Sequence, residues 1–212
     1  ANPLSIQANS PLYRTIASIR GVNASGVADS LNRPVVLTGT VQSINYRPTG
    51  LEFSMADFSA GVHFFKTANV NPAYTVRAGD SIRVRGTVGQ FRGLIQISPD
   101  SISIVQANRN VKTPQPKSQA TEATEGSLIR ISNLTITSNS PWGGTGNYTA
   151  KALPQGSNTD TVFIRVDADA QISIPKPIGT FNVIGVSGQF TPTTSAPFVS
   201  GFTLSEEMIL SK

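Results

Sequence analysis

The stretches VRGTVGQF (Val84–Phe91) and VIGVSGQF (Val183–Phe190) share the frame V-x-G-x-x-G-Q-F, and the second begins 99 residues after the first. Fixed glycines suit a strand that must bend, because a missing side chain lets the backbone of a small barrel curve. The positions between the fixed residues differ, since Arg85 in the first copy becomes Ile184 in the second. The frame therefore predicts a repeated piece of architecture rather than a repeated reaction site.

Five strands in the same order are predicted around each frame. In the first copy, apolar and polar residues alternate along short segments separated by turn residues, a pattern typical of half-buried strands. The same order of segments returns in the second copy, which indicates a tandem repeat. The predicted strands of the first copy are 36–43, 51–55, 62–66, 82–88 and 94–105, and those of the second are 128–136, 148–153, 162–166, 183–190 and 201–204.

The strand order, with a connector between the third and fourth strands, is that of an OB-fold barrel. Before the first strand, Leu12, Ile16 and Ile19 recur at helical spacing and predict a short amphipathic helix. We therefore expect an all-β chain of two tandem five-stranded OB-like barrels with a short N-terminal helix. The expected parts are an N-terminal segment with the helix packed on the first barrel (1–33), the first barrel (34–107), a polar linker (108–124) and the second barrel (125–212).

The run Val36–Val105 contains G-T-V in its first strand, A-G-D-x-I-R-V-R-G-T-V at its fourth strand and G-L-I-Q-I after it. In these motifs the chain resembles the OB-fold domains of bacterial secreted proteins, of the kind found beside extracellular nucleases, phosphatases or cell-surface modules. The likeness covers the first copy well, and the second more loosely through V-x-G-x-x-G-Q-F and its final strand. It implies a noncatalytic binding or spacer domain, commonly supposed to touch nucleic acid.

Composition narrows the chemistry that the chain can perform. It has no cysteine, which excludes disulfides and thiol catalysis, and one histidine, which excludes a histidine-rich metal site. Residues 1–124 hold 12 Lys/Arg against 6 Asp/Glu, whereas residues 125–212 hold 5 against 6, so the net charge of +5 belongs to the first half.

The low charged fraction of 14% favours an extracytoplasmic protein, secreted or on the cell surface. No apolar run is long enough for a membrane span. We expect no enzyme activity and no cofactor.

Single-stranded nucleic acid or a polysaccharide is one expected ligand, bound by the first barrel. OB-fold barrels take single strands across strands two and three, where aromatic rings stack on bases and Lys or Arg side chains follow phosphates. A plain surface histidine is the alternative reading of His63. The candidate ligand-binding residues are Arg47, His63, Phe65, Lys66, Arg83, Arg85 and Arg92.

A protein partner is the other expectation, and it concerns the second barrel. Ile184 and Val186 make its fourth strand apolar on the side that Arg85 and Thr87 keep polar in the first, and such a surface calls for a cover. Trp142 lies in a loop rich in Pro and Gly, where it is either a hydrophobic plug or an exposed contact. The candidate partner-contact residues are Trp142, Ile184 and Val186.

Asp167 and Asp169 are a weak calcium candidate, because the surrounding loop lacks the further acidic ligands of a calcium cage, and no metal site is predicted. The expected function is a noncatalytic extracellular binding or assembly module that acts as a structural or interaction component of a cell-surface or secreted complex. The alternative is a protein that binds single-stranded nucleic acid or polysaccharide as an accessory to a secreted nuclease or phosphatase.

Overall fold

A computed structural model gives the fold of the chain and describes residues 12–137, 139–143, 147–170, 175–190 and 206–210. The described residues are mostly β, which confirms the all-β prediction. Their helical content consists of short 3₁₀ helices, and in these ranges no helix has the length and apolar character that crossing a membrane requires. The 3₁₀ helices are η1 (Ala17–Ile19), η2 (Glu122–Thr124) and η3 (Ala168–Ala170).

The first sheet has the strand order β1-β2-β3-β4-β6-β5, and β2 also pairs with β5. The pairings therefore run in a ring through β2, β3, β4, β6 and β5. All neighbours are antiparallel except β1 with β2 and β4 with β6, which are parallel. The strands are β1 (Leu12–Tyr13), β2 (Pro34–Val41), β3 (Leu51–Ala56), β4 (Gly61–Lys66), β5 (Ser81–Phe91) and β6 (Leu94–Gln106).

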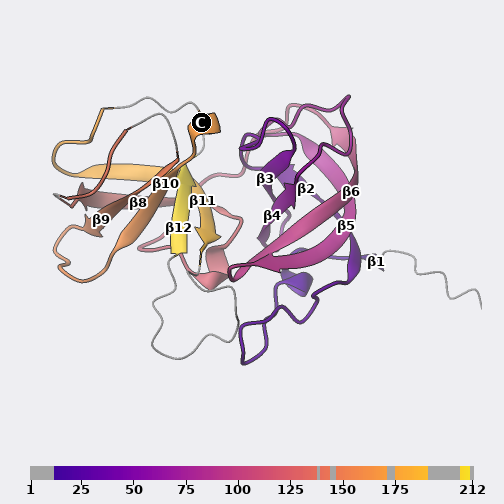
Figure 1. Cartoon of the computed structure of the whole chain (residues 1–212), viewed down its shortest axis with the longest axis horizontal. Helices are drawn as coiled ribbons and strands as arrows, with labels where there is room; N and C mark the ends of the chain where they lie inside the picture. Colours follow the sequence, from indigo (N-terminus) through magenta and orange to yellow (C-terminus); the bar gives the residue numbers. More distant parts are fainter. Residues whose placement is uncertain (1–11, 138, 144–146, 171–174, 191–205, 211–212) are drawn as a thin grey trace, which may run out of the picture.

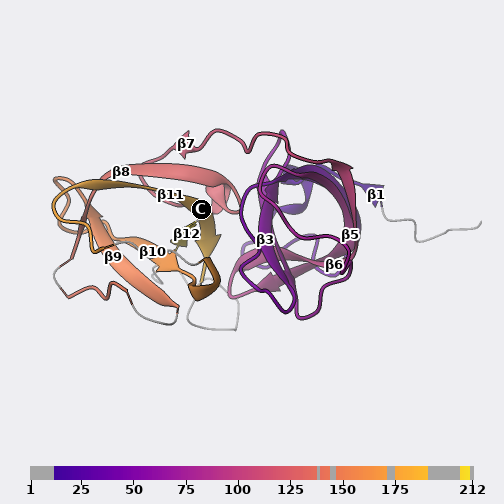
Figure 2. The same ribbon diagram turned by 90° about the horizontal axis from the view of Figure 1, so that it is seen from above.

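The second sheet repeats this topology strand for strand. Its order is β11-β12-β10-β9-β8-β7, β11 also pairs with β8, and the parallel pairs are β7 with β8 and β10 with β12. The strands are β7 (Gln115–Pro116), β8 (Leu128–Ile136), β9 (Tyr148–Pro154), β10 (Val162–Val166), β11 (Phe181–Gln189) and β12 (Glu206–Leu210). We call β1–β6 with η1 the first unit and β7–β12 with η2 and η3 the second unit; Figures 1 and 2 show them side by side.

The shared frame fixes which positions of the two units correspond. In the first unit, the ladder leads from Gly89 in β5 across β6 to His63 in β4. In the second, it leads from Gly188 in β11 across β12 to Phe163 in β10. His63 and Phe163 therefore occupy the same position, and the repeat inferred from the sequence extends to the strand register.

One expectation differs from the structure, and another falls on residues that the structure does not describe. In place of the expected N-terminal amphipathic helix, the chain forms β1 and the three-residue η1. Ile16 and Ile19 are nevertheless buried, because a 3₁₀ turn also brings residues three apart onto one side. The predicted strand 201–204 lies outside the described residues, and β12 begins at Glu206.

Each unit has its own hydrophobic core. In the first, the inward rings of Phe53 and Phe64 stack with their centroids 4.7 Å apart. In the second, the residues at these two places are Ala150 and Ile164, which pair with each other in the same register. The smaller side chains are complemented by Trp142, which packs against that core.

The connection between the units is bonded to the first unit along its length. β6 ends at Gln106 and β7 begins at Gln115, within the segment that the sequence predicts to be a linker. The main-chain N of Asn108 donates to Oδ1 of Asp80 at 3.0 Å, and that of Lys112 donates to Oε1 of Gln42 at 3.2 Å. The predicted linker thus contains β7, η2 and anchored backbone.

Candidate functional site

A buried ion pair lies where the two units meet. Arg20 follows η1 and Glu125 follows η2, so the two residues hold corresponding cap positions. Nη2 of Arg20 is 3.0 Å from Oε2 of Glu125, and their side chains are 9% and 2% exposed. The guanidinium also donates to the main-chain oxygens of Gly61, Glu122 and Glu125. The charges are therefore compensated on both sides, which buried ions require.

His63 lies at this junction and not on the surface. His63 is 5% exposed, and its Nε2 atom is 3.0 Å from the main-chain oxygen of Ser187 in β11. The neutral ring therefore carries its proton on Nε2 and donates it. Burial lowers the pKa of His63 to about 4, and the nearby charge of Arg20 acts in the same direction against the hydrogen bond. Ser54, its cross-strand partner, is also fully buried.

Glycines let the two main chains approach closely at the junction. A Cβ atom at Gly61 would collide with the main chain of Gly126, and one at Gly126 would collide with that of Val62. Gln189, the glutamine of the second frame, is buried nearby. The side-chain amide of Gln189 is oriented so that its nitrogen faces acceptors. The nitrogen then donates to Oε1 of Glu125 at 2.7 Å and to the main-chain oxygen of Gly93 at 3.1 Å. The frame thus contributes to the joint as well as to strand shape.

Three predicted ligand residues lie near one another at the end of β4. The guanidinium carbon of Arg47 is 5.3 Å from the ring centroid of Phe65, a cation–π contact. Nζ of Lys66 is 3.4 Å from Oδ1 of Asp100. These residues contact neighbours within the first unit, and Phe65 is only partly exposed.

Arg83 and Arg85 are exposed on the outer side of β5. The guanidinium carbon of Arg83 lies 5.7 Å from the ring centroid of Tyr13 in β1, a side chain that is 71% exposed. Arg14 follows in the chain and is also exposed. This part of the first unit therefore presents arginines beside one aromatic ring.

Arg92 occupies the turn between β5 and β6 and lies near two aromatic rings. Its guanidinium carbon is 5.7 Å from the ring centroid of Phe91 and 4.6 Å from that of Phe190. The two rings are the last residues of the two V-x-G-x-x-G-Q-F frames and meet edge to face at 6.5 Å. The repeated frames thus converge at the junction, which the sequence repeat alone did not indicate.

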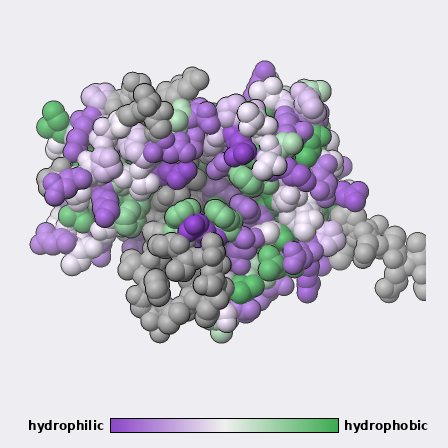
Figure 3. Space-filling view, viewed as in Figure 1, coloured by the Kyte–Doolittle hydropathy of each residue, from purple (hydrophilic) through white to green (hydrophobic). Residues whose placement is uncertain are grey.

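The predicted partner-contact residues have different surroundings. Trp142 packs edge to face on Tyr148 at 6.0 Å and on Phe181 at 6.4 Å. Val186 is fully buried, whereas Ile184 is 45% exposed. On the face of the molecule in Figure 3, hydrophobic residues are scattered among hydrophilic ones.

A pocket of about 540 Å³ between the units is lined by both acidic and basic residues. It brings the predicted Arg47, Asp167 and Asp169 together with Glu52 and Arg165. Burial raises the pKa of Glu52, and the charge of Asp167 adds to the rise while Arg165 opposes it. In the described part of the chain, no group of three or more His, Asp or Glu residues has an arrangement that could hold a metal ion. The acidic and basic side chains that line this pocket compensate one another's charge.

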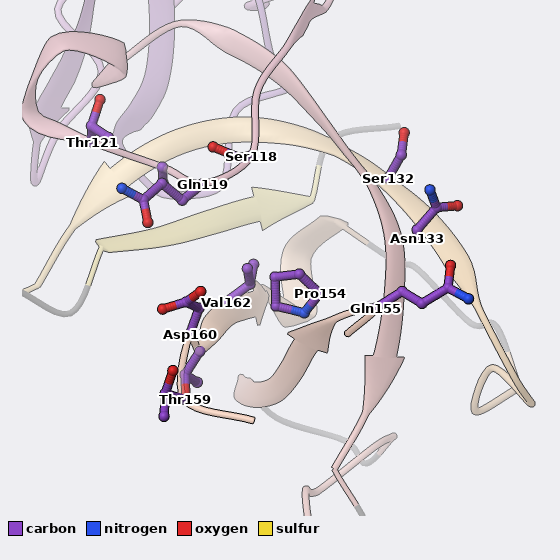
Figure 4. Close-up of a pocket in the computed structure, with 12 residues that line it drawn as sticks. Ser118, Gln119, Thr121, Ser132, Asn133, Pro154, Gln155, Thr159, Asp160 and Val162 are labelled. Atoms are coloured by element: carbon purple, nitrogen blue, oxygen red, sulfur yellow. The ribbon is translucent and has the colours of Figure 1, made fainter. Parts of the chain in front are cut away.

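A larger pocket of about 700 Å³ lies within the second unit (Figure 4). Pro154 and Val162 are at its centre, between Gln119 on one side and Asn133 on the other. Its walls come from the segment before η2, from β8, and from the connection between β9 and β10. Local sequence patterns do not indicate this pocket, because its lining comes from three separate segments: the predicted linker, the predicted strand 128–136 and the turn that follows residue 153.

Comparisons with known proteins do not place the chain in a family. No protein-family model matches it, and no curated protein matches it. One solved structure, described as "Structural mimicry for functional antagonism", is 12% identical and has a TM-score of 0.37, with 81% of this chain and 87% of that chain covered. Another, described as "Molecular basis for abrogation of activation of pro-inflammatory cytokines", is 10% identical with a TM-score of 0.34, with 84% and 89% covered.

Proposed function

We propose that the chain is a noncatalytic, extracytoplasmic binding or assembly module in which two OB-like barrels form one rigid component of a cell-surface or secreted complex. The observation that carries this proposal is the contact between His63 and Ser187, 3.0 Å apart. It lies on the outer side of β3 and β4, the side on which OB-fold barrels take single-stranded ligands. Because the second unit covers part of this side, an internal contact takes the place of a ligand there.

The chemistry of the joint supports a fixed arrangement of the units. The side chains of Arg20 and Glu125 are each less than a tenth exposed in the docked arrangement, and separating the units would break their ion pair. Replacing one member alone leaves the other charge buried without its partner, which typically costs about 3–5 kcal/mol, so the joint depends on both residues being present. Such a pair suits a component that holds its partners at a fixed distance.

The test is the rotational diffusion of the whole chain, measured by ¹⁵N relaxation. We expect amides of both units to report a single correlation time, and the Arg20→Ala variant to report two shorter ones. Independent tumbling of the units in the unaltered protein would overturn the proposal.

Binding of single-stranded nucleic acid is the second candidate, favoured by the exposed Arg83 and Arg85 beside Tyr13. Phosphate contacts by arginine make affinity fall with salt, and an aromatic ring offers a stacking surface. The check is fluorescence anisotropy of a labelled mixed-sequence oligonucleotide at low and high salt. The assembly proposal expects no binding; a salt-dependent signal that is lost in Arg83→Glu/Arg85→Glu would replace it with this alternative.

A further inference from the structure

The two units differ in the segment that enters each sheet. We call Leu12–Ile19 and Gln115–Thr124 the entry segments; each contains a two-residue strand and ends in a 3₁₀ helix. In the first unit, the residue just before the helix is Ile16, which is fully buried in the core. Its main-chain N donates to Oδ2 of Asp57 at 2.8 Å. These contacts close the space between the entry segment and the β3–β4 turn.

In the second unit the corresponding space is open. The residue before η2 is Thr121, whose main-chain N bonds within its own turn, to Oγ1 of Thr124. The connection from β9 to β10 is also longer, 155–161 against 57–60 in the first unit. The pocket of about 700 Å³ lies there, and a further hollow of about 400 Å³ also borders Ser118, Gln119 and Thr121.

The lining of this pocket selects a class of ligand. It contains no Lys or Arg and a single carboxylate, Asp160, so a phosphate-bearing or otherwise anionic ligand would find no counter-charge. Most other lining side chains are hydroxyls and amides, which both donate and accept hydrogen bonds. Within the described residues, the side-chain amides of Gln119, Asn133 and Gln155 make no hydrogen bond.

A neutral molecule rich in hydroxyl groups matches these features. Its hydroxyls can pair with the amides and with Asp160, while its C–H faces contact the apolar centre formed by Pro154 and Val162. A carboxylate oxygen can accept from two adjacent hydroxyls at once. Carbohydrates are the common polymer with this chemistry outside the cytoplasm.

We propose that the pocket between the entry segment of the second unit and its β9–β10 connection binds a neutral oligosaccharide. This inference rests on the proposed function, in which it supplies a ligand for the second unit. At the equivalent place in the described part of the first unit, Ile16 is buried in the core and its main-chain N is bonded to Asp57.

The test is an NMR titration of the whole ¹⁵N-labelled chain with neutral oligosaccharides built from glucose, mannose, galactose, xylose or N-acetylglucosamine. We expect at least one of them to shift amides around Gln119, Asn133 and Asp160. Thr121→Ile restores the side chain of the first unit and should weaken binding by about tenfold or more, because it fills the pocket. Gln119→Ala, at an exposed side chain that leaves the fold intact, should also weaken binding through lost hydrogen bonds.

Lys151→Ala is the matched control, because Lys151 is an exposed residue of the same unit that does not line the pocket; its binding should be unchanged. The inference is overturned if no oligosaccharide shifts these amides, if both pocket variants bind as well as the unaltered chain, or if a neutral Gly-Ser-Gln peptide binds there and no oligosaccharide does. Any of these outcomes leaves the single correlation time of the assembly proposal untouched, so the two can fail separately.

Discussion

The first unit fills the space beneath its entry segment, whereas the second leaves it open, although both have the same strand order and register. Ile16 in the first unit is fully buried where Thr121 in the second lines a pocket. The core of the second unit also has the smaller side chain at an equivalent position, because Ala150 lies where the first unit has Phe53. A sheet can therefore keep its strand order and register while the side chains packed against it change, and a pocket lies where the larger side chain is absent.

The largest effect is expected at the joint that both units share. Arg20→Ala leaves Glu125, 2% exposed, without its cation, and should lower the free energy of unfolding by about 3–5 kcal/mol. Urea denaturation monitored by circular dichroism measures it. Lys66→Ala, which breaks the exposed pair with Asp100, serves as the control and should change stability by less than about 1 kcal/mol. Equal effects of the two variants would contradict the buried joint.

Ile16→Thr gives the first unit the residue type that the second unit has at this place, Thr121. The change should open the space that the Ile16 side chain fills. The loss of a fully buried isoleucine side chain is expected to cost about 2–4 kcal/mol, because a hydroxyl enters an apolar core and a cavity remains. Urea denaturation measures the resulting change in the free energy of unfolding. A change below about 1 kcal/mol would mean that the entry segment is not a plug of the first core.

Acid should weaken the joint through His63. Its folded pKa of about 4 lies below the ordinary 6.5, so as pH falls the unfolded chain takes up the proton first. The contribution of neutral His63 to the free energy of unfolding is therefore fully present above pH 6.5. It declines as the pH falls from 6.5 towards 4, by at most about 1.4 kcal/mol per pH unit. The measurement compares urea midpoints near neutral pH and in mild acid for the unaltered chain and for His63→Gln, which keeps a donor near Nε2. If the variant shows the same pH slope, His63 is not its source.

Thr121→Ile is expected to have the smallest effect on stability, less than about 1 kcal/mol in either direction, because the pocket it fills is open to solvent. Thermal unfolding followed by calorimetry is precise enough to detect such a change. A loss of several kcal/mol would show that Thr121 has a packing role in the second unit, and the comparison with Ile16 would then have to be redrawn.

Alternation and turn residues are local signals, and they predict β2–β6 and β8–β11. They do not predict the two-residue strands β1 and β7 or the position of β12. The sequence also reveals the repeat, since the frame residues recur with their spacing. The spacing of Ile16 and Ile19 predicts a helix, but α and 3₁₀ turns share this spacing. The chain instead forms η1 there, after Leu12 and Tyr13 pair in parallel with β2.

The candidate sites were harder to predict, because they depend on contacts between residues far apart in the chain. His63 appears as an ordinary residue of an exposed strand, and nothing local indicates that Ser187 covers it. Arg20 and Glu125 belong to segments read as helix and domain start, and their pairing requires both units. One signal was available, since both residues follow a short turn that precedes the first long strand of their repeat.

The backbone between the units, with Asn108 and Lys112 bonded to the first unit, has a mechanical consequence. A tether of this kind has little slack, so a pulling force applied across the molecule would load the Arg20–Glu125 joint and the anchored backbone together. These contacts would have to break before the molecule could lengthen. In the proposed surface assembly, such a component would pass a pulling force between its neighbours without lengthening.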